Sequence, residues 1–536
     1  MIKSGDKVLI IGEHPLRRCF EQQYFRLKCQ VTSVTELGGQ DVLLYDEFVL
    51  LSMPCNTDKL AQDNRMLALL NNIAKQIPAG SHRRPLAHLL LQSNHTLGLL
   101  QNIDLPDTVI SKMDVYPFTL ESLWSRVVVA KMPGEFLDID YPSLDREPML
   151  ESSHKFVHLL VVGFSAMAQS IAIHAALVSH YPNHTDSSPL RTRISFMSNG
   201  MDSRRGEFIT RYRSLFDNSY YTTLNLDNKL SSFHEPCYCG ERNDFVDVEW
   251  EFIDGDFYSD EAQAMLKKLS TSNDRVLTIA VAHDNEDQNI KNVMALPGEV
   301  MENDIAVLVN VHNSESMSLL KNSDKFHNVF PFGMDDTGYD VRLPLMQGGK
   351  LLNAFYCDLI DVESGHIDQR RVDEAWKCLP SFAKRFSNVY SAMTIPSKMR
   401  SLGHDRSCPE RFFSVSPHEV EIMAVVEHNR WCVEELILGF RPCTDVELKQ
   451  VEESIDAFLA AKDVEEKIKN WKLRDKKGEL CTLKEIFKED ETKRAHYDLC
   501  NYYDLRHDYR GVNVQEYDKK LIRCIPLLAH ALLKCE

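Results

Sequence analysis

Long apolar runs and the common catalytic motifs are missing from this sequence. The longest apolar candidate, residues 157–162, has the length of a strand and is far shorter than the ~20 residues that span a bilayer. There is no Gly-x-Ser-x-Gly turn, no Walker A loop and no His-Glu-x-x-His motif. We therefore expect no direct membrane insertion. No residue can be assigned a catalytic role from these motifs. Their absence does not exclude an enzyme.

Positive charge is also scarce. The chain has 61 Lys and Arg against 79 Asp and Glu, a net charge of -18. Nucleic acids and anionic membranes both attract clustered basic residues, so we expect neither as a partner. A secretory signal has a basic start followed by a hydrophobic segment. The first residues of this chain show no such segment. The expected location is the cytoplasm.

The cysteines lack framework spacing. Their number is 14, scattered along the chain, which is typical of reduced thiols in a cytosolic protein. The closest pair is Cys237 and Cys239, with His234 nearby. Paired zinc ligands prefer two to four intervening residues, so we expect no metal site.

Short apolar segments alternate with helical stretches over the first 340 residues or so, a pattern typical of parallel α/β sheets. In the first part these segments lie at residues 7–12, 30–34, 41–45, 48–51, 86–91 and 127–130. In the second part they lie at residues 154–163, 193–199, 275–282 and 304–310. The sequence thus predicts an α/β fold with two Rossmann-like parallel-sheet domains in tandem, residues 1–150 and 151–340.

The turn after the first predicted strand contains one glycine, Gly12, where a dinucleotide site uses three. Glu13 places a negative charge where a pyrophosphate would lie. We therefore interpret residues 1–150 as a degenerate Rossmann-like domain with an interaction role. A repeat of the same fold at a spacing of about 150 residues is suggested, since Gly163 follows the first strand of the second domain as Gly12 follows that of the first.

The turn after the first strand of the second domain is better suited to a phosphate. Gly163 supplies the tight turn, Ser165 is small enough for close approach, and a helix follows at residues 169–180. Asn199 and Asp284 follow later strands, where ligands bind in parallel sheets. Capping of the next helix is the alternative: it is equally favoured for Asp284 and preferred for Asn285. The candidate cofactor-binding residues are Gly163, Phe164, Ser165, Ala166, Met167, Asn199 and Asp284.

The second domain resembles the TrkA-N or RCK type of nucleotide-binding domain, which regulates potassium channels and transporters. The resemblance lies in the strand and helix around Gly163 and in residues 276–297, where Ala282-His-Asp-Asn-Glu precedes Asn289 and Ala295-Leu-Pro. It covers about residues 154–334. It implies a Rossmann domain that binds an adenine nucleotide or NAD and pairs into a homo-oligomer.

Residues 424–440 form the most informative helix of the sequence. Apolar residues such as Val426, Val433 and Leu436 share one face, and His428, Trp431 and Glu435 share another. Such a helix either holds a flat ligand or packs with a satisfied polar edge, and helix physics alone favours packing.

This helix resembles the opening helix of the ryanodine-receptor repeat (RyR) domain: an acidic residue, His428, two variable residues, Trp431, another acidic residue and a Gly-aromatic pair. The second half of the pattern stands at residues 496–505 and 517–526. The chain departs from it at Gly439-Phe440, where the family has Gly-Trp, and in a charged insertion at residues 446–492. The resemblance implies a mainly helical domain at residues 416–536. Its implied ligand-binding residues are Glu427, His428, Arg430, Trp431, Glu435 and Tyr502.

A connecting helical region, residues 341–415, joins the TrkA-N-like domain to the RyR-like domain. Within it, residues 384–403 predict one amphipathic helix and residues 404–417 a linker. The function indicated is a cytosolic ligand sensor that binds a nucleotide-like small molecule through the TrkA-N-like domain, the RyR domain or both. The alternatives are a nucleotide-processing enzyme and a soluble gating subunit of a separate channel or transporter.

Overall fold

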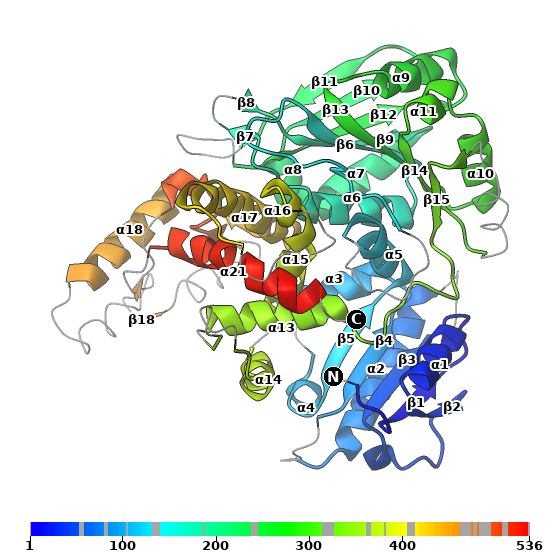
Figure 1. Cartoon of the computed structure of the whole chain (residues 1–536), viewed down its shortest axis with the longest axis vertical. Helices are drawn as coiled ribbons and strands as arrows, with labels where there is room; N and C mark the ends of the chain where they lie inside the picture. Colours follow the sequence, from blue (N-terminus) through cyan, green and yellow to red (C-terminus); the bar gives the residue numbers. More distant parts are fainter. Residues whose placement is uncertain are drawn as a thin grey trace.

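The computed structural model has three parts, two sheets with their helices and a helical part, which lie against one another (Figure 1). Among the residues that it describes, no helix is long and apolar enough to cross a membrane. It describes residues 2–533 apart from 53–57, 80–83, 103–104, 131–139, 186–187, 237–244, 314–325, 358, 361–365, 380–381, 405–412, 461–472, 475–479, 482–494 and 506–512.

The first sheet is entirely parallel and has the strand order 2-1-3-4-5. Its central strands are buried along nearly their whole length, because helices cover both faces. Its strands are β1 (Lys7–Ile11), β2 (Gln30–Val34), β3 (Glu47–Leu51), β4 (Leu86–Leu90) and β5 (Asp114–Phe118). Its main helices are α1 (Arg17–Arg26), α2 (Lys59–Gln76), α3 (Asn94–Asn102) and α5 (Leu120–Val129).

The second sheet has eight strands in the order β11-β10-β12-β9-β6-β13-β14-β15, and only β11 runs antiparallel to its neighbour. Its strands are β6 (Phe156–Val162), β9 (Thr192–Ser198), β10 (Tyr221–Asn225), β11 (Ser231–His234), β12 (Val248–Asp254), β13 (Arg275–Val281), β14 (Ala306–Asn310) and β15 (Val329–Phe332). Its helices include α6 (Ala166–Val178), α7 (Met201–Arg211), α8 (Arg213–Asp217), α9 (Asp260–Ser270) and α10 (Glu286–Met294).

Both sheets have doubly wound orders, but the two orders differ. Without β10 and β11, the second sheet reads 3-2-1-4-5-6 in chain order, whereas the first reads 2-1-3-4-5. The prediction of an α/β fold with two parallel-sheet units is confirmed. A duplication of one fold is not supported, because the strand orders do not correspond.

Two predicted strands are wrong. Residues 42–44 form a short 3-10 helix (Val42–Leu44), capped by the Asp41 side chain. Residues 127–129 end α5, which a capping box at Thr119 starts. The valines there resemble a strand because α5 is buried along most of its length and packs against α6.

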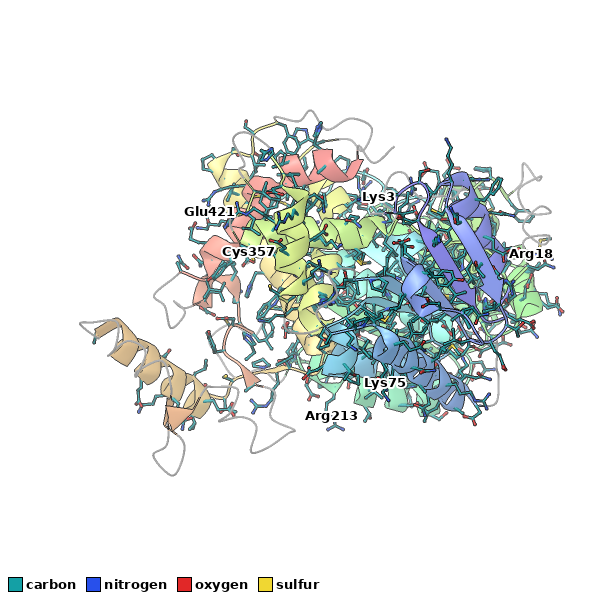
Figure 2. The ribbon with its side chains drawn as sticks, turned by 90° about the horizontal axis from the view of Figure 1, so that it is seen from below. Lys3, Arg18, Lys75, Arg213, Cys357 and Glu421 are labelled. Carbon is teal, nitrogen blue, oxygen red and sulfur yellow. The ribbon has the colours of Figure 1, made fainter. Side chains whose placement is uncertain are left out.

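The helical part follows the second sheet and includes α13 (Pro344–Tyr356), α14 (Gln369–Lys377), α15 (Phe382–Met393), α16 (Ile395–Ser401), α17 (Pro417–Ile437), α18 (Asp445–Ala460) and α21 (Gln515–Leu533). The single helix expected at residues 384–403 is two, α15 and α16, which meet at Thr394 because Pro396 starts a new helix. α17 begins with a capping box between Ser416 and Glu419. α18 extends away from the rest of the chain in both whole-chain views (Figures 1 and 2).

Specific contacts dock the three parts. The segment after β15 returns to the first sheet, where the Tyr339 hydroxyl lies 2.6 Å from His88 Nδ1. Trp124 Nε1 donates to the Met334 carbonyl at 3.0 Å. Arg400 of α16 donates twice to the buried Asp145 carboxylate, at 2.7 and 2.8 Å. These contacts hold the three parts together, so a cavity between them is lined by residues of more than one part.

Candidate functional site

In the predicted cofactor turn, the side chains are engaged in packing and capping. The Ser165 hydroxyl caps α6 by accepting from the Ala168 N–H at 3.1 Å, and it donates to the Ala282 carbonyl at 2.7 Å. The Phe164 ring packs against Phe196 and Phe208 with centroids 4.8 and 5.6 Å apart. Met167 is buried. Capping and packing therefore explain the side chains of Phe164, Ser165 and Met167 without a bound phosphate.

The other predicted cofactor residues lie at the surface or on a cavity. Asn199 and Asp284 are exposed. Asn285 caps α10 through the Gln288 N–H at 3.2 Å, which confirms the capping interpretation for that residue. Ala166 lines a large cavity between the sheets. Cys237 and Cys239 lie outside the described residues, and within the described ones no group of three or more metal-binding side chains occurs.

A pocket of about 340 Å³ lies beside α17 in the helical part. We call it the α17 pocket. Its walls come from α13, α15, α17 and α21 and from the segments that precede α21 in the chain. Its lining is Asn353, Tyr356, Leu379, Lys384, Ser387, Asn388, Ser391, Glu427, His428, Arg430, Trp431, Asp498, Val514, Tyr517 and Asp518.

Four of the six predicted ligand-binding residues line the α17 pocket: Glu427, His428, Arg430 and Trp431. The other two lie outside its lining. Glu435 is one helical turn beyond Trp431, and Tyr502 is buried with its ring edge-on to His428, 5.8 Å between centroids.

Sequence reasoning also missed lining residues on other helices. Asp518 belongs to the Tyr517-Asp518 pair in the second half of the RyR pattern, which was a signal for it. Asn353 carried no such signal, because its place at the pocket depends on how α13 packs.

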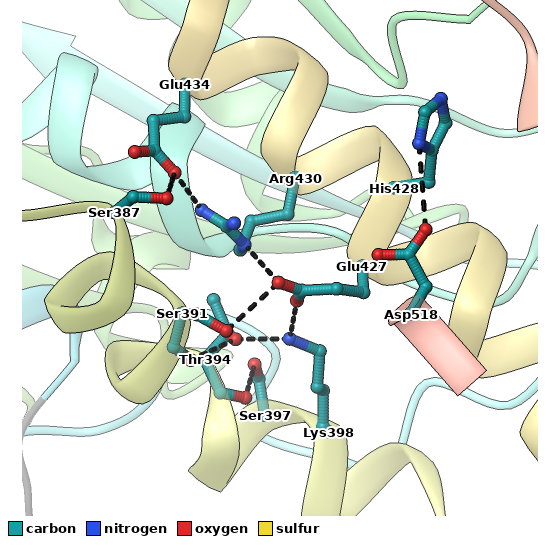
Figure 3. Close-up of polar contacts among 10 residues, drawn as sticks. All are labelled: Ser387, Ser391, Thr394, Ser397, Lys398, Glu427, His428, Arg430, Glu434 and Asp518. Carbon is teal, nitrogen blue, oxygen red and sulfur yellow. Dashed lines mark hydrogen bonds and ion pairs between the residues drawn. The ribbon is translucent and has the colours of Figure 1, made fainter. Parts of the chain in front are cut away.

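A buried ionic network forms the base of the pocket (Figure 3). The Glu427 carboxylate accepts from Lys398 Nζ, from Arg430 Nε at 3.0 Å and from the Ser391 hydroxyl at 3.0 Å. Arg430 Nη1 also donates to Glu434 at 2.6 Å. Side chains of Lys398, Glu427, Arg430 and Glu434 are each at most 2% exposed. Buried charges of this kind are found paired, and here each has an opposite charge.

Mutual attraction keeps Glu427 and Arg430 charged. Burial alone would raise the pKa of Glu427, but Arg430 and Lys398 outweigh burial and lower that pKa to about 2. Burial would lower the pKa of Arg430, but Glu427 and Glu434 raise it above its usual range. For Lys398 burial prevails over Glu427 and the pKa falls. Glu427 is therefore held as a carboxylate by two cations.

His428 presents an acceptor at the pocket. Its Nε2 lies 2.9 Å from the Cys500 carbonyl oxygen, which can only accept, so Nε2 carries the proton. Burial lowers the pKa of His428 to about 4, so the ring is neutral at pH 7 and Nδ1 has a free lone pair. Nδ1 lies 3.8 Å from Asp518 Oδ2, too far for a hydrogen bond. A donor placed between these two atoms would bind both.

Two further buried polar atoms at the pocket have no hydrogen-bond partner among the described residues. They are Nδ2 of Asn353, a donor, and Oδ1 of Asn388, an acceptor. Buried polar groups are nearly always paired. Trp431 is half-buried and adds a flat wall to the pocket. The His496 ring packs edge-on against Trp431, with 5.0 Å between the ring centroids. The α17 pocket thus combines an aromatic surface with unused donors and acceptors.

Comparison with known proteins adds no assignment to this geometry. No family model matches the chain, and no curated protein matches it. The similarities to TrkA-N and RyR domains therefore stay predictions from the sequence, and the functional argument rests on the pocket.

Proposed function

We propose that this chain is a cytoplasmic ligand sensor that binds a nucleotide-like small molecule in the α17 pocket. The observation that carries the proposal is the convergence of Glu427, His428, Arg430 and Trp431 on one pocket with unpaired polar atoms. Its volume of about 340 Å³ lies at the lower end of the ~300–1,000 Å³ typical of small-molecule sites. It suits a nucleoside-sized group better than a whole dinucleotide.

The chemistry of the lining favours a nitrogen-rich planar group. Trp431 offers a face for stacking, and His428 Nδ1 and Asp518 Oδ2 offer two acceptors 3.8 Å apart. An exocyclic amine, as in adenine, supplies two N–H donors that fit this pair. Burial and the neighbouring Glu427 raise the pKa of Asp518 well above its usual range, because this part of the pocket disfavours further negative charge. A phosphate is disfavoured there for the same reason, so the base end of a nucleotide is the part that we assign to the pocket.

We assign binding rather than turnover to this pocket. Its most deeply buried carboxylate, Glu427, already accepts from Lys398, Arg430 and Ser391, so it is a poor general base. A ligand offered to the protein should be recovered unchanged. Consumption of a nucleotide by the purified protein would favour the enzyme alternative.

The two family resemblances belong to the same proposal. The strand order 3-2-1-4-5-6 of the second sheet supports a Rossmann domain of the TrkA-N type at residues 151–340. The pairing of α17 with α21 around the pocket supports an RyR-type domain at residues 416–536. Domains of the first kind regulate partners, so a homo-oligomer and a separate membrane or effector protein are part of the proposal.

Trp431→Ala should weaken the binding of adenosine by about 5- to 150-fold. Stacking of a base on an aromatic side chain contributes about 1–3 kcal/mol, and 1.4 kcal/mol is about tenfold in affinity. Trp431→Phe keeps a flat ring and should lose less. Isothermal titration with adenosine, after circular dichroism has shown that each variant is folded, measures the effect.

Glu435→Ala is the matched control on the same helix, because Glu435 lies outside the pocket lining. It should leave adenosine binding unchanged. Equal affinities of wild type, Trp431→Ala and Trp431→Phe would remove the α17 pocket as the site, and so would the absence of adenosine binding to the wild-type protein.

A further inference from the structure

A second, larger cavity of about 750 Å³ lies where the three parts of the chain meet. Gln92, Ser93 and Asn94 follow β4 and line it from the first sheet. From the second sheet's part, one side of α6 along most of its length and one side of α7 line it. Residues 437–439 at the end of α17 close it from the helical part. Carboxyl ends of parallel strands are where ligands bind in such sheets, and here the segment after β4 and the helices that follow β6 and β9 contribute to one cavity.

The cavity is positive although the whole chain is negative. Four basic side chains line it, Lys59, Arg126, Arg204 and Arg211, against the two carboxylates Glu121 and Glu207, which leaves two positive charges in excess. The chain as a whole carries -18. The excess is therefore a local feature of this cavity.

Its two histidines, His95 and His174, add no charge at neutral pH. Burial lowers the pKa of each, that of His174 to about 4. The positive excess thus comes from lysine and arginine, which stay charged at every physiological pH.

Three of the four cations are bound only by neutral groups. Arg126 donates to the Ser122 carbonyl at 3.0 Å and to the Tyr116 hydroxyl. Arg204 donates to the Ser198 hydroxyl at 3.1 Å. Arg211 donates to the Asn94 carbonyl at 3.2 Å.

Across the described residues, these three guanidiniums form no ion pair, whereas Lys59 lies 3.9 Å from Glu121. Arg126 is only 7% exposed. A buried cation without a counter-ion is unfavourable, so a bound anion would complete the site.

Another part of the wall is apolar and aromatic and includes Ile173, Leu177, Phe208, Tyr212 and Tyr390. The volume is within the range of small-molecule sites and exceeds what inorganic phosphate fills. We propose that this cavity binds a phosphate-bearing small molecule of nucleotide size, with its phosphates at Arg126, Arg204 and Arg211 and its ring or apolar body against the aromatic wall. Guanidinium groups favour phosphate because they donate in parallel pairs.

This site is independent of the α17 pocket. That pocket lies beside the middle of α17 and suits a nitrogen-rich base, whereas the cavity has an excess of positive charge and lies at the C-terminal end of α17. Trp431 lines the first and Ile437 the second. Six residues of helix separate them, about 9 Å along the axis. The two proposals can therefore be tested independently, and either can be wrong without the other.

The test is a titration of the full chain with ATP and, separately, with pyrophosphate. The double variant R204Q/R211Q should weaken ATP binding by about tenfold or more, since each loses a charge-assisted hydrogen bond to phosphate. Both side chains are at least partly exposed, so the fold should be kept. The matched control is R213Q. Arg213 is exposed (labelled in Figure 2), lies just after α7 and is outside the lining, so this variant should bind ATP as the wild type does.

Other outcomes would overturn the proposal. These are no ATP binding by the wild type at millimolar concentration, equal ATP affinity of R204Q/R211Q and wild type, and loss of binding in R213Q to the same extent. Pyrophosphate binding as tightly as ATP would contradict the role given to the aromatic wall. Trp431→Ala should leave the arginine-dependent ATP affinity unchanged, which separates this cavity from the α17 pocket.

Discussion

Glu427→Ala should lower the free energy of unfolding by about 3–5 kcal/mol, because removing one partner of a buried ion pair leaves uncompensated charge inside the protein. Lys398 and Arg430 both contact this carboxylate, and their side chains are 1% and 2% exposed. Arg430 keeps Glu434, whereas the ion pair with Glu427 is the only one found for Lys398 among the described residues. Most of the loss should therefore come from Lys398. Urea unfolding followed by circular dichroism measures it.

Glu421→Ala provides the matched control on the same helix. Glu421 also forms an ion pair, with Lys519 at 2.6 Å, but its side chain is 55% exposed and it lies at the surface in Figure 2. Exposed pairs contribute about 0–1 kcal/mol. The double variant Lys398→Met/Glu427→Leu should recover much of the stability, since apolar replacement of a buried pair is often neutral. Equal effects of Glu427→Ala and Glu421→Ala would contradict the role of the network.

The same carboxylate sets a pH dependence. Arg430 and Lys398 overcome burial and lower the pKa of Glu427 to about 2 in the folded protein, below the ~4.3 of an unperturbed glutamate. The stabilisation is therefore complete above the unfolded pKa and is lost as pH falls through the folded one. The stability difference between wild type and Glu427→Ala should shrink as the pH is lowered from about 5 towards 2.

The positions of individual strands depend mainly on residues that are neighbours in the sequence, and these positions are what the sequence predicts best. β6 and β13 are mostly apolar segments, so the sequence predicts both within two residues of their ends. β5 and β12 carry Asp, Glu or Pro among their apolar residues and were missed. Strand order depends on contacts between distant segments, so the difference between the two sheets was not predictable from one sequence.

The candidate pocket shows the same division. Spacing along α17 brought His428 and Trp431 to one side of the helix, and both line the pocket. The neighbouring glutamates illustrate the limit: Glu434 joins the ionic network and Glu435 does not, although adjacent residues differ only by about 100° around a helix. Lys398 comes from another helix, and the large cavity needs all three parts of the chain, so a local sequence pattern predicts neither the ion pair of Lys398 with Glu427 nor the cavity.

Gly163→Ala should destabilise the protein by about 2–5 kcal/mol, through a strained backbone and overpacking. Gly163 has a φ of +113°, and a Cβ atom there would lie 2.6 Å from the Ala282 carbonyl oxygen and 3.0 Å from the His283 nitrogen. These are backbone atoms at the end of β13, which pairs directly with β6, so they cannot move aside cheaply. Thermal unfolding of the variant gives the measurement.

Gly206→Ala is the opposite control in the same chain. Gly206 lies inside α7, and a Cβ atom there would meet nothing within 4 Å, so alanine should stabilise the helix by about 0.5–1 kcal/mol. A wild-type melting temperature for Gly163→Ala, with the expected gain for Gly206→Ala, would contradict the packing role of Gly163. If the loss is found, no substitution of Gly163 can report on phosphate binding at this turn, because any side chain there disrupts the sheet before a ligand is considered. Binding at the neighbouring cavity must then be tested through its arginines, which leave the contact between β6 and β13 intact.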